Sequence, residues 1–188
     1  MSIRIPRGQP RRGGYYPPAL SGLTKLYINK TKYEINSKES HIMKIAVGSD
    51  HGGVNHKAMI LEYLKEKGYE TKDFGTNSAE SVDYPDIAKP VGIAVRDGEF
   101  DCGILICGTG IGMSIAANKI KGIRAAHVTD TYSAKMAKQH NNAQIICLGE
   151  RITGPDLALE IVKAYLGEEH LGGRHSRRVE KLMELENI

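Results

Sequence analysis

The sequence has no tryptophan, only two phenylalanines and only three cysteines among its 188 residues. Three is an odd number, and each cysteine lies in or at the end of an apolar run, so reduced thiols are expected rather than a disulfide framework. No apolar run approaches the roughly 20 residues that span a bilayer, and the N-terminus lacks the apolar core of a secretion signal. These absences predict a cytoplasmic protein without a membrane partner.

A strong charge of one sign is also missing from most of the chain. The formal net charge is +4, but residues 1–42 hold eight of the 26 Lys and Arg residues and only two of the 22 Asp and Glu residues. The remainder is therefore near neutral and lacks the clustered basic face that binds nucleic-acid phosphates, so no nucleic-acid partner is expected. A nucleic-acid role for the basic N-terminal segment alone is an alternative.

Residues 1–42 are predicted to form a poorly ordered basic N-terminal extension. They carry four of the seven prolines and show no sustained period of 2 or 3.6 residues. A short alternating stretch at 25–35 leaves a hairpin or an edge strand possible. The composition changes at Met43, so we expect the folded domain to occupy residues 43–188, and a natural start at Met43 is a hypothesis.

From residue 43 onward, apolar runs alternate with helical periodicity, which is typical of βαβ units. The expected strands are 44–48, 70–74, 102–106, 124–128 and 144–148, and the expected helices are 56–67, 86–95, 113–119, 133–139, 155–166 and 176–185. The predicted fold class is therefore α/β, a three-layer Rossmann-like domain with a five-stranded parallel sheet. Ligands of such sheets bind beyond the carboxyl ends of the strands, so functional residues are expected there.

The loop after the third expected strand reads Cys107-Gly-Thr-Gly-Ile-Gly112. Its three glycines lie between a buried strand and a helix, which allows successive backbone N–H groups to face an anion. A dinucleotide-binding turn is an alternative, with Asp130 as the possible ribose partner, but the motif follows the third strand rather than the first.

Cys107 opens this loop, where a helix N-terminus can make a thiolate available as a base or nucleophile. Cys102 and Cys147 lie within expected strands and are predicted to be small core residues.

Asp50 and His51 follow the first expected strand, and His140 ends the helix after the fourth. These side chains could converge on the Cys107 loop or face it from another subunit, and they favour acid–base chemistry. Metal binding is the competing use of such residues. No short ligand spacing such as His-x-x-x-His or Cys-x-x-Cys occurs, so no metal is expected.

The segment Gly172-Gly-Arg-His-Ser-Arg-Arg178 precedes the last expected helix. Arg174 and Arg178 are four residues apart, so on a helical turn both guanidinium groups lie on one face and could grip a phosphate. Arg151, after the fifth strand, adds a third cation. A solvated charged face or a salt-bridged helix start is the alternative.

Taken together, these motifs, with Asp83-Tyr-Pro85 and Ala116-Ala-Asn-Lys119, resemble the ribose-5-phosphate isomerase B family in order and spacing over residues 43–188. The resemblance implies an aldose–ketose isomerase that interconverts ribose 5-phosphate and ribulose 5-phosphate through a cis-enediolate, with no cofactor. It also implies a homodimer or tetramer with active sites shared between subunits. The alternatives are an allose-6-phosphate or galactose-6-phosphate isomerase, or a non-catalytic sugar-phosphate-binding protein.

The resemblance further implies roles for individual residues. Cys107 would remove the C2 proton and return it at C1. His140 would open the sugar ring with Asp50 nearby, and Thr109 would shuttle protons between the sugar oxygens. The implied substrate-binding residues are Gly108, Gly110 and Gly112 for the enediolate, Tyr84, Ser114 and Asn141 for hydroxyls, and His51, Arg151, Arg174 and Arg178 for the phosphate.

Overall fold

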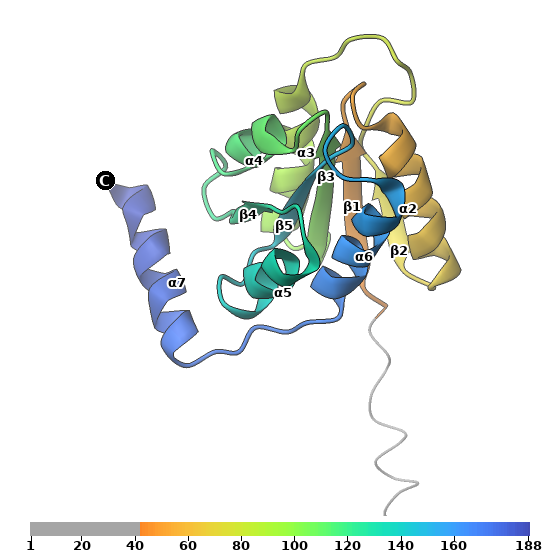
Figure 1. The fold of residues 1–188 in the computed structure, drawn as a ribbon. Helices are drawn as coiled ribbons and strands as arrows, with labels where there is room; N and C mark the ends of the chain where they lie inside the picture. The colour runs from red at the N-terminus through yellow and green to blue at the C-terminus, as the bar shows by residue number, and fades with distance from the viewer. Residues whose placement is uncertain (1–41) are drawn as a thin grey trace, which may run out of the picture. The chain divides into compact units, whose positions relative to one another are not determined.

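The computed structural model describes residues 42–188, so the predicted N-terminal extension and its possible strand at 25–35 lie outside the described residues. The described part contains a five-stranded parallel sheet in the order β2-β1-β3-β5-β4 (Figure 1). The strands are β1 (Lys44–Ser49), β2 (Glu70–Asp73), β3 (Cys102–Cys107), β4 (Ala125–His127) and β5 (Ile145–Gly149). Every strand end lies within one residue of its predicted position, and the α/β fold class is confirmed.

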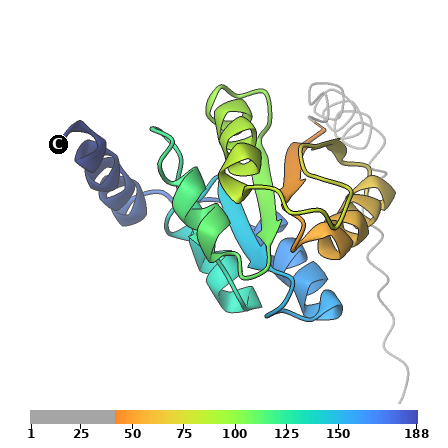
Figure 2. The ribbon, with the colours of Figure 1, turned by 90° about the horizontal axis from the view of Figure 1, so that it is seen from above.

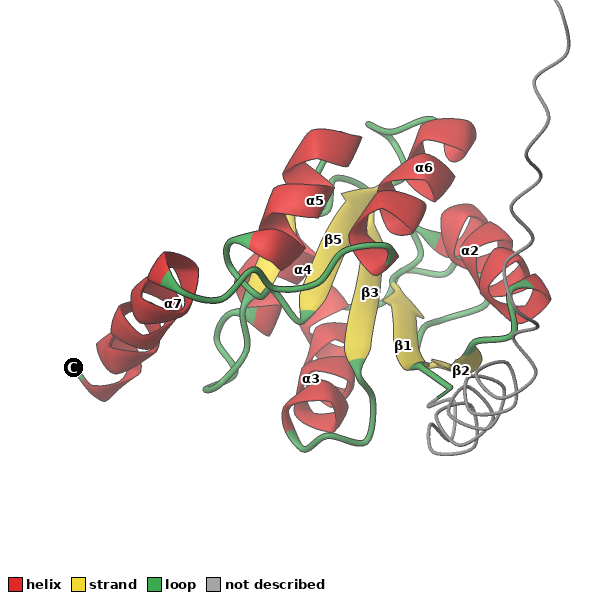
Figure 3. Cartoon of the chain, turned by 90° about the horizontal axis from the view of Figure 1, so that it is seen from below, coloured by secondary structure: helices red, strands yellow, loops and turns green. Residues whose placement is uncertain are grey.

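Helices cover both faces of the sheet (Figure 3). One face carries α2 (Val54–Glu66), α5 (Thr131–Gln139) and α6 (Pro155–Leu166), and the other carries α3 (Tyr84–Arg96) and α4 (Ile111–Ala117). All but α6 begin two residues before their predicted starts. The apolar period that located these helices begins only after their first residues, which are exposed or half-buried.

The central strands show the alternation that sends neighbouring side chains to opposite layers. In β3, Ile104 and Ile106 join the apolar cluster under α2, α5 and α6, whereas Leu105 and Cys107 join the cluster under α3 and α4. β2 departs from the apolar strand that was predicted, because its residues are mostly exposed and charged. It lies at the edge of the sheet, where charged side chains discourage pairing with another strand.

The last helix, α7 (Arg174–Glu184), lies to one side of these layers and is followed by a 3₁₀ turn, Leu185–Asn187 (Figures 1 and 2). Its C-terminal end is tied back to the domain, because the Glu186 carboxylate accepts hydrogen bonds of 2.9 and 3.1 Å from the amide of Gly122. Leu182 and Leu185 remain 44% and 59% exposed. Among residues 42–188, no helix combines the length and apolar character that crossing a membrane requires.

Candidate active site

Three loops meet at the carboxyl edge of β1, β3 and β5, and glycine allows their backbones to touch. A Cβ atom on Gly149 would lie 2.6 Å from the carbonyl carbon of Thr109. A Cβ atom on Gly52 would lie 2.9 Å from the amide nitrogen of Gly108. Real side chains do not tolerate such distances, so glycine is required at both positions for these loops to approach one another.

Cys107 is the last residue of β3 and is 5% exposed. Its sulfur accepts a hydrogen bond from the backbone N–H of Gly110 at 3.0 Å. Gly110 has a φ of 79°, in the left-handed region that favours glycine, and this turn of the chain directs its amide back to the sulfur. The thiol therefore lies on the last residue of the strand, one residue beyond the predicted strand end, and it faces a polar donor.

Side chains of the glycine-rich loop accept hydrogen bonds from two of its own amides. The amide of Gly110 contacts the Cys107 sulfur, and the amide of Ile111 donates to the Thr109 hydroxyl at 3.3 Å. Two donors are thus occupied by the loop's own side chains.

The other two cysteines are core residues, as predicted. Cys102 is 2% exposed and Cys147 is fully buried. Burial raises the pKa of the Cys102 thiol to about 12 and raises the pKa of the Cys147 thiol as well. Both groups therefore stay protonated at neutral pH, which leaves Cys107 as the thiol with access to a functional edge.

Asp50 and His51 follow β1 at the same edge. The buried Asp50 carboxylate accepts a 2.8 Å hydrogen bond from the amide of Gly52, which fixes the turn between β1 and α2. The His51 ring nitrogen Nδ1 accepts from the amide of Val82 at 3.3 Å, which connects this turn to the segment before α3. Both side chains are thereby held beside the Cys107 loop.

Tyr84 and Arg151 approach the glycine-rich loop from either side. A Cβ atom on Gly112 would lie 3.0 Å from the Tyr84 ring, and one on Gly108 would lie 3.3 Å from the Arg151 guanidinium carbon. Glycine at both loop positions gives these two side chains close contact with the backbone that leads away from Cys107. The structure thus brings Tyr84 and Arg151 into contact with the glycine-rich loop.

A second group lies around the end of α5. The rings of His140 and His175 are stacked, with centroids 4.2 Å apart and planes 10° apart. With Asn141, Arg178, Val179 and Leu182 they line an open pocket of about 340 Å³. Burial and the neighbouring cationic groups lower the pKa of His175, and Arg174 Nε lies 3.3 Å from its ring nitrogen Nε2.

These two groups lie at opposite edges of the sheet. α5 runs back against the strand direction, and the residues that follow His140 pair with the start of β4 through a hydrogen bond from the Gln144 amide to the Arg124 carbonyl. The length of a whole strand, with a rise of about 3.3 Å per residue, separates that edge from Cys107. Convergence of His140 and Cys107 within one chain is therefore wrong. The predicted phosphate-binding residues are likewise divided, with Arg151 near Cys107 and Arg178 near His140.

Two other residues named from the sequence, Ser114 and Asp130, make hydrogen bonds within the fold. The Ser114 hydroxyl donates to the carbonyl of Ala125 at 3.4 Å. Asp130 caps α5, accepting from the amide and the hydroxyl of Ser133 at 2.8 and 2.7 Å. The dinucleotide alternative thereby loses its ribose partner, because the Asp130 carboxylate serves the helix start.

Sequence reasoning missed His127 and Glu150. A Cβ atom on Gly110 would lie 2.7 Å from the His127 ring, so this imidazole touches the loop that contacts Cys107. The Glu150 carboxylate accepts hydrogen bonds from the amide of His56 at 2.8 Å and the side chain of Asn55 at 2.7 Å, which joins the loop after β5 to α2. Both residues stand at or just after a carboxyl strand end, and that position was the available signal. Residues 42–188 contain no cluster of three or more His, Cys, Asp or Glu side chains placed to hold a metal ion.

The fold and this edge, with a thiol held by a glycine-rich turn, define an α/β protein whose candidate site lies beyond the carboxyl ends of its strands. The chain belongs to the Ribose/Galactose Isomerase family, whose model matches residues 45–182.

Individual proteins agree with this assignment. The chain is 50% identical over 143 residues to ribose-5-phosphate isomerase B of Escherichia coli, which covers 76% of this chain and 96% of that one. It is 46% identical over 142 residues to D-erythrulose-4-phosphate isomerase of Pectobacterium atrosepticum, covering 75% and 93%. The solved ribose-5-phosphate isomerase B of Clostridium thermocellum has 57% identity and a TM-score of 0.76, and the match covers 77% of this chain and 98% of that one.

Proposed function

We propose that this protein is an aldose–ketose isomerase that interconverts ribose 5-phosphate and ribulose 5-phosphate. The observation that carries the proposal is the Cys107 sulfur, 3.0 Å from a backbone donor at the ligand-binding edge of the family fold. The high identity to a relative named for this reaction supports the substrate. We assign the activity to the cytoplasm, because an odd number of cysteines is compatible with reduced thiols in a reducing environment.

Cys107 acts as the base in this proposal. Its thiolate takes the proton from C2 of the open aldose. The C–H electron pair forms the C1–C2 double bond of a cis-enediolate, while the π pair of the C1 carbonyl moves onto the C1 oxygen. The same sulfur returns the proton to C1, while the Thr109 hydroxyl relays a proton from the C2 oxygen to the C1 oxygen. No atom is gained or lost, and a single residue moves the carbon-bound proton.

The enediolate carries negative charge, which preorganised donors stabilise at little reorganisation cost. The amides of Gly108, Gly110 and Gly112 are proposed as these donors, with the Gly110 amide, which donates to the Cys107 sulfur at 3.0 Å, exchanging that hydrogen bond for one to the enediolate. Loss of one such donor in other enzymes costs about a hundred- to a thousand-fold in rate. Tyr84 and Arg151, which pack on this loop, are proposed to hold a hydroxyl and the phosphate, with His51 and the nearby Asp50 completing this side.

Ring opening requires a second copy of the chain. We infer that His140 of one subunit faces Cys107 of another, because the topology places them at opposite edges of one sheet. Asn141, Arg174 and Arg178 then reach the substrate with His140, and the two arginines hold the phosphate. Ser114 remains a proposed hydroxyl contact. The open His140 pocket and the exposed leucines of α7 support a homodimer, alone or within a tetramer.

The decisive experiment measures kcat/KM for ribose 5-phosphate, allose 6-phosphate and galactose 6-phosphate on the same preparation. We expect the five-carbon substrate to be turned over with the highest kcat/KM. Faster turnover of a six-carbon substrate would reassign the substrate. Saturable binding of ribose 5-phosphate without ketose formation would instead make the protein a non-catalytic sugar-phosphate binder.

A further inference from the structure

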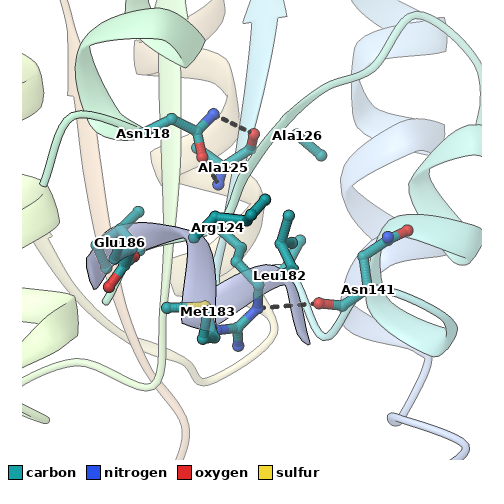
Figure 4. A pocket seen from close by; sticks show the side chains of 11 residues that line it. Asn118, Arg124, Ala125, Ala126, Asn141, Leu182, Met183 and Glu186 are labelled. Carbon is teal, nitrogen blue, oxygen red and sulfur yellow. Dashed lines mark hydrogen bonds between the residues drawn. The ribbon is translucent and has the colours of Figure 1, made fainter. Parts of the chain in front are cut away.

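Arg124 stands just before β4 and contacts the turn that carries His140 (Figure 4). Its Nε donates to the carbonyl of Asn141 at 3.0 Å, and its Nη2 donates to the carbonyl of Asn142 at 2.8 Å. The side chain is half-buried, and this burial lowers the pKa of the guanidinium. Two neighbouring carbonyls are thus held by one planar group, which suits an arginine and not a lysine.

The backbone of Arg124 is itself fixed, so its side chain extends from a rigid base. Its amide donates to the side chain of Gln144 at 2.9 Å, and its carbonyl accepts from the Gln144 amide at 3.0 Å. The next residue, Ala125, exchanges two hydrogen bonds of 2.9 and 2.7 Å with the side chain of Asn118. Movement of the guanidinium relative to the sheet is therefore restricted.

The turn after α5 depends on such outside contacts. The carbonyls at a helix C-terminus have no partner within the helix. Asn142 has a φ of 45°, in the left-handed region that non-glycine residues rarely adopt. On the other side of His140, the carbonyl of Gln139 accepts the Leu171 amide at 3.0 Å and faces a ring nitrogen of His170 at 2.9 Å. Side chains and backbone from other segments thus set the conformation that presents His140.

The same guanidinium also touches the C-terminal end of α7. Its Nη1 lies 3.1 Å from the sulfur of Met183, and the Glu186 carboxylate acts on it electrostatically. These groups line a cavity of about 420 Å³ between α7 and the domain (Figure 4). With a smaller side chain at position 124, the carbonyls of Asn141 and Asn142 would face this cavity, and no other side chain among residues 42–188 would replace the lost hydrogen bonds.

We propose that Arg124 is a positioning residue that fixes the turn presenting His140 and Asn141 and joins it to α7, the helix that carries Arg174 and Arg178. This inference rests on the proposed isomerase function. Arg124 does not need to touch the sugar, because it acts through the carbonyls on either side of the Asn141–Asn142 peptide. Its loss should weaken the ring-opening half of the site and leave the Cys107 half intact.

The test compares Arg124→Met, Arg124→Lys and the matched surface control Arg96→Met, whose arginine is paired only with its neighbour Asp97 among the described contacts. Two substrates are used: ribose 5-phosphate, which forms a ring, and erythrose 4-phosphate, which cannot close a five-membered ring because its C4 oxygen carries the phosphate. For Arg124→Met we expect kcat/KM to fall about ten- to a hundred-fold on the cyclic substrate and less on the acyclic one. Arg124→Lys should recover part of the loss, and Arg96→Met should behave as wild type.

A second measurement follows the histidine rings by NMR, with the His140 signal identified by its absence from His140→Asn. We expect Arg124→Met to shift or broaden the His140 signal and to leave His56 unchanged, since His56 is buried against Thr153 at the other edge. A purely structural role would lower the melting temperature but leave the substrate ratio and the His140 signal as in wild type, and that result would overturn the proposal. If wild type turned over neither substrate, the proposed function would fail, and the NMR comparison would still decide the role of Arg124.

Discussion

At the carboxyl edge of the sheet, Cys107 is 5% exposed and is held by the backbone of its own loop. At the opposite edge, His140 and Arg178 line an open pocket, and the turn beneath them is held by side chains from distant segments. The contacts that hold Cys107 thus come from its own loop, whereas the His140 pocket is open. In the proposed function, that pocket faces Cys107 of a second subunit.

This difference follows from the way each edge is built. Glycines bring the three carboxyl-edge loops into backbone contact, so few side chains are needed to keep Cys107 in place. The His140 turn instead depends on Arg124 and on the segment that leads to α7. Substitutions at the first edge should therefore affect chemistry alone, whereas substitutions at the second should affect chemistry and assembly together.

The largest effect is expected from Cys107→Ala. If the sulfur is the base, kcat should fall at least about a thousand-fold, because no other group would move the carbon-bound proton. Cys102→Ala is the matched control, since it removes a sulfur from the core, and it should lose stability while retaining kcat. Circular dichroism establishes that both variants are folded. Turnover of ribose 5-phosphate by folded Cys107→Ala near the wild-type rate would remove the thiol from the mechanism.

Mixing inactive variants tests whether the two halves come from different subunits. A heterodimer of Cys107→Ala and His140→Asn has one site with both residues intact and one site with both replaced. Random exchange of subunits should therefore restore activity to about a quarter of wild type. Each variant exchanged with itself is the control. If heterodimers form, as mass spectrometry can establish, and activity does not return, the shared site is incorrect.

His140→Asn should discriminate between substrates. Loss of the ring-opening group should lower kcat/KM for ribose 5-phosphate by about a hundred-fold, because the general acid–base contribution is lost. Erythrose 4-phosphate needs no ring opening, so its kcat/KM should fall much less. Arg96→Met, whose arginine pairs with its neighbour Asp97, serves as the control. Equal losses on the two substrates in His140→Asn would contradict a role in ring opening.

Local pattern was sufficient to predict the buried strands β1, β3 and β5 and the loop that begins at Cys107, because each of these strands is a run of apolar residues. It could not show that His140 lies at the other edge, since that depends on the direction in which α5 returns along the sheet. Nor could it identify Arg124, whose partners are carbonyls and carry no sequence signal. Every helix start except that of α6 was missed by two residues, because exposed first turns have no apolar period.

The smallest expected effect is a change in how the melting temperature depends on pH. Burial lowers the pKa of His175, with added repulsion from His140 and the nearby arginines, so the folded protein resists protonation there while the unfolded chain accepts a proton at the ordinary value near 6.5. The unfolded state therefore binds more protons just below that value, and stability must fall as the pH falls through it. Between pH 7.5 and 5.5, the melting temperature of wild type should decrease more than that of His175→Gln. Parallel curves for wild type and His175→Gln would show that the His140 pocket does not respond to protonation of His175.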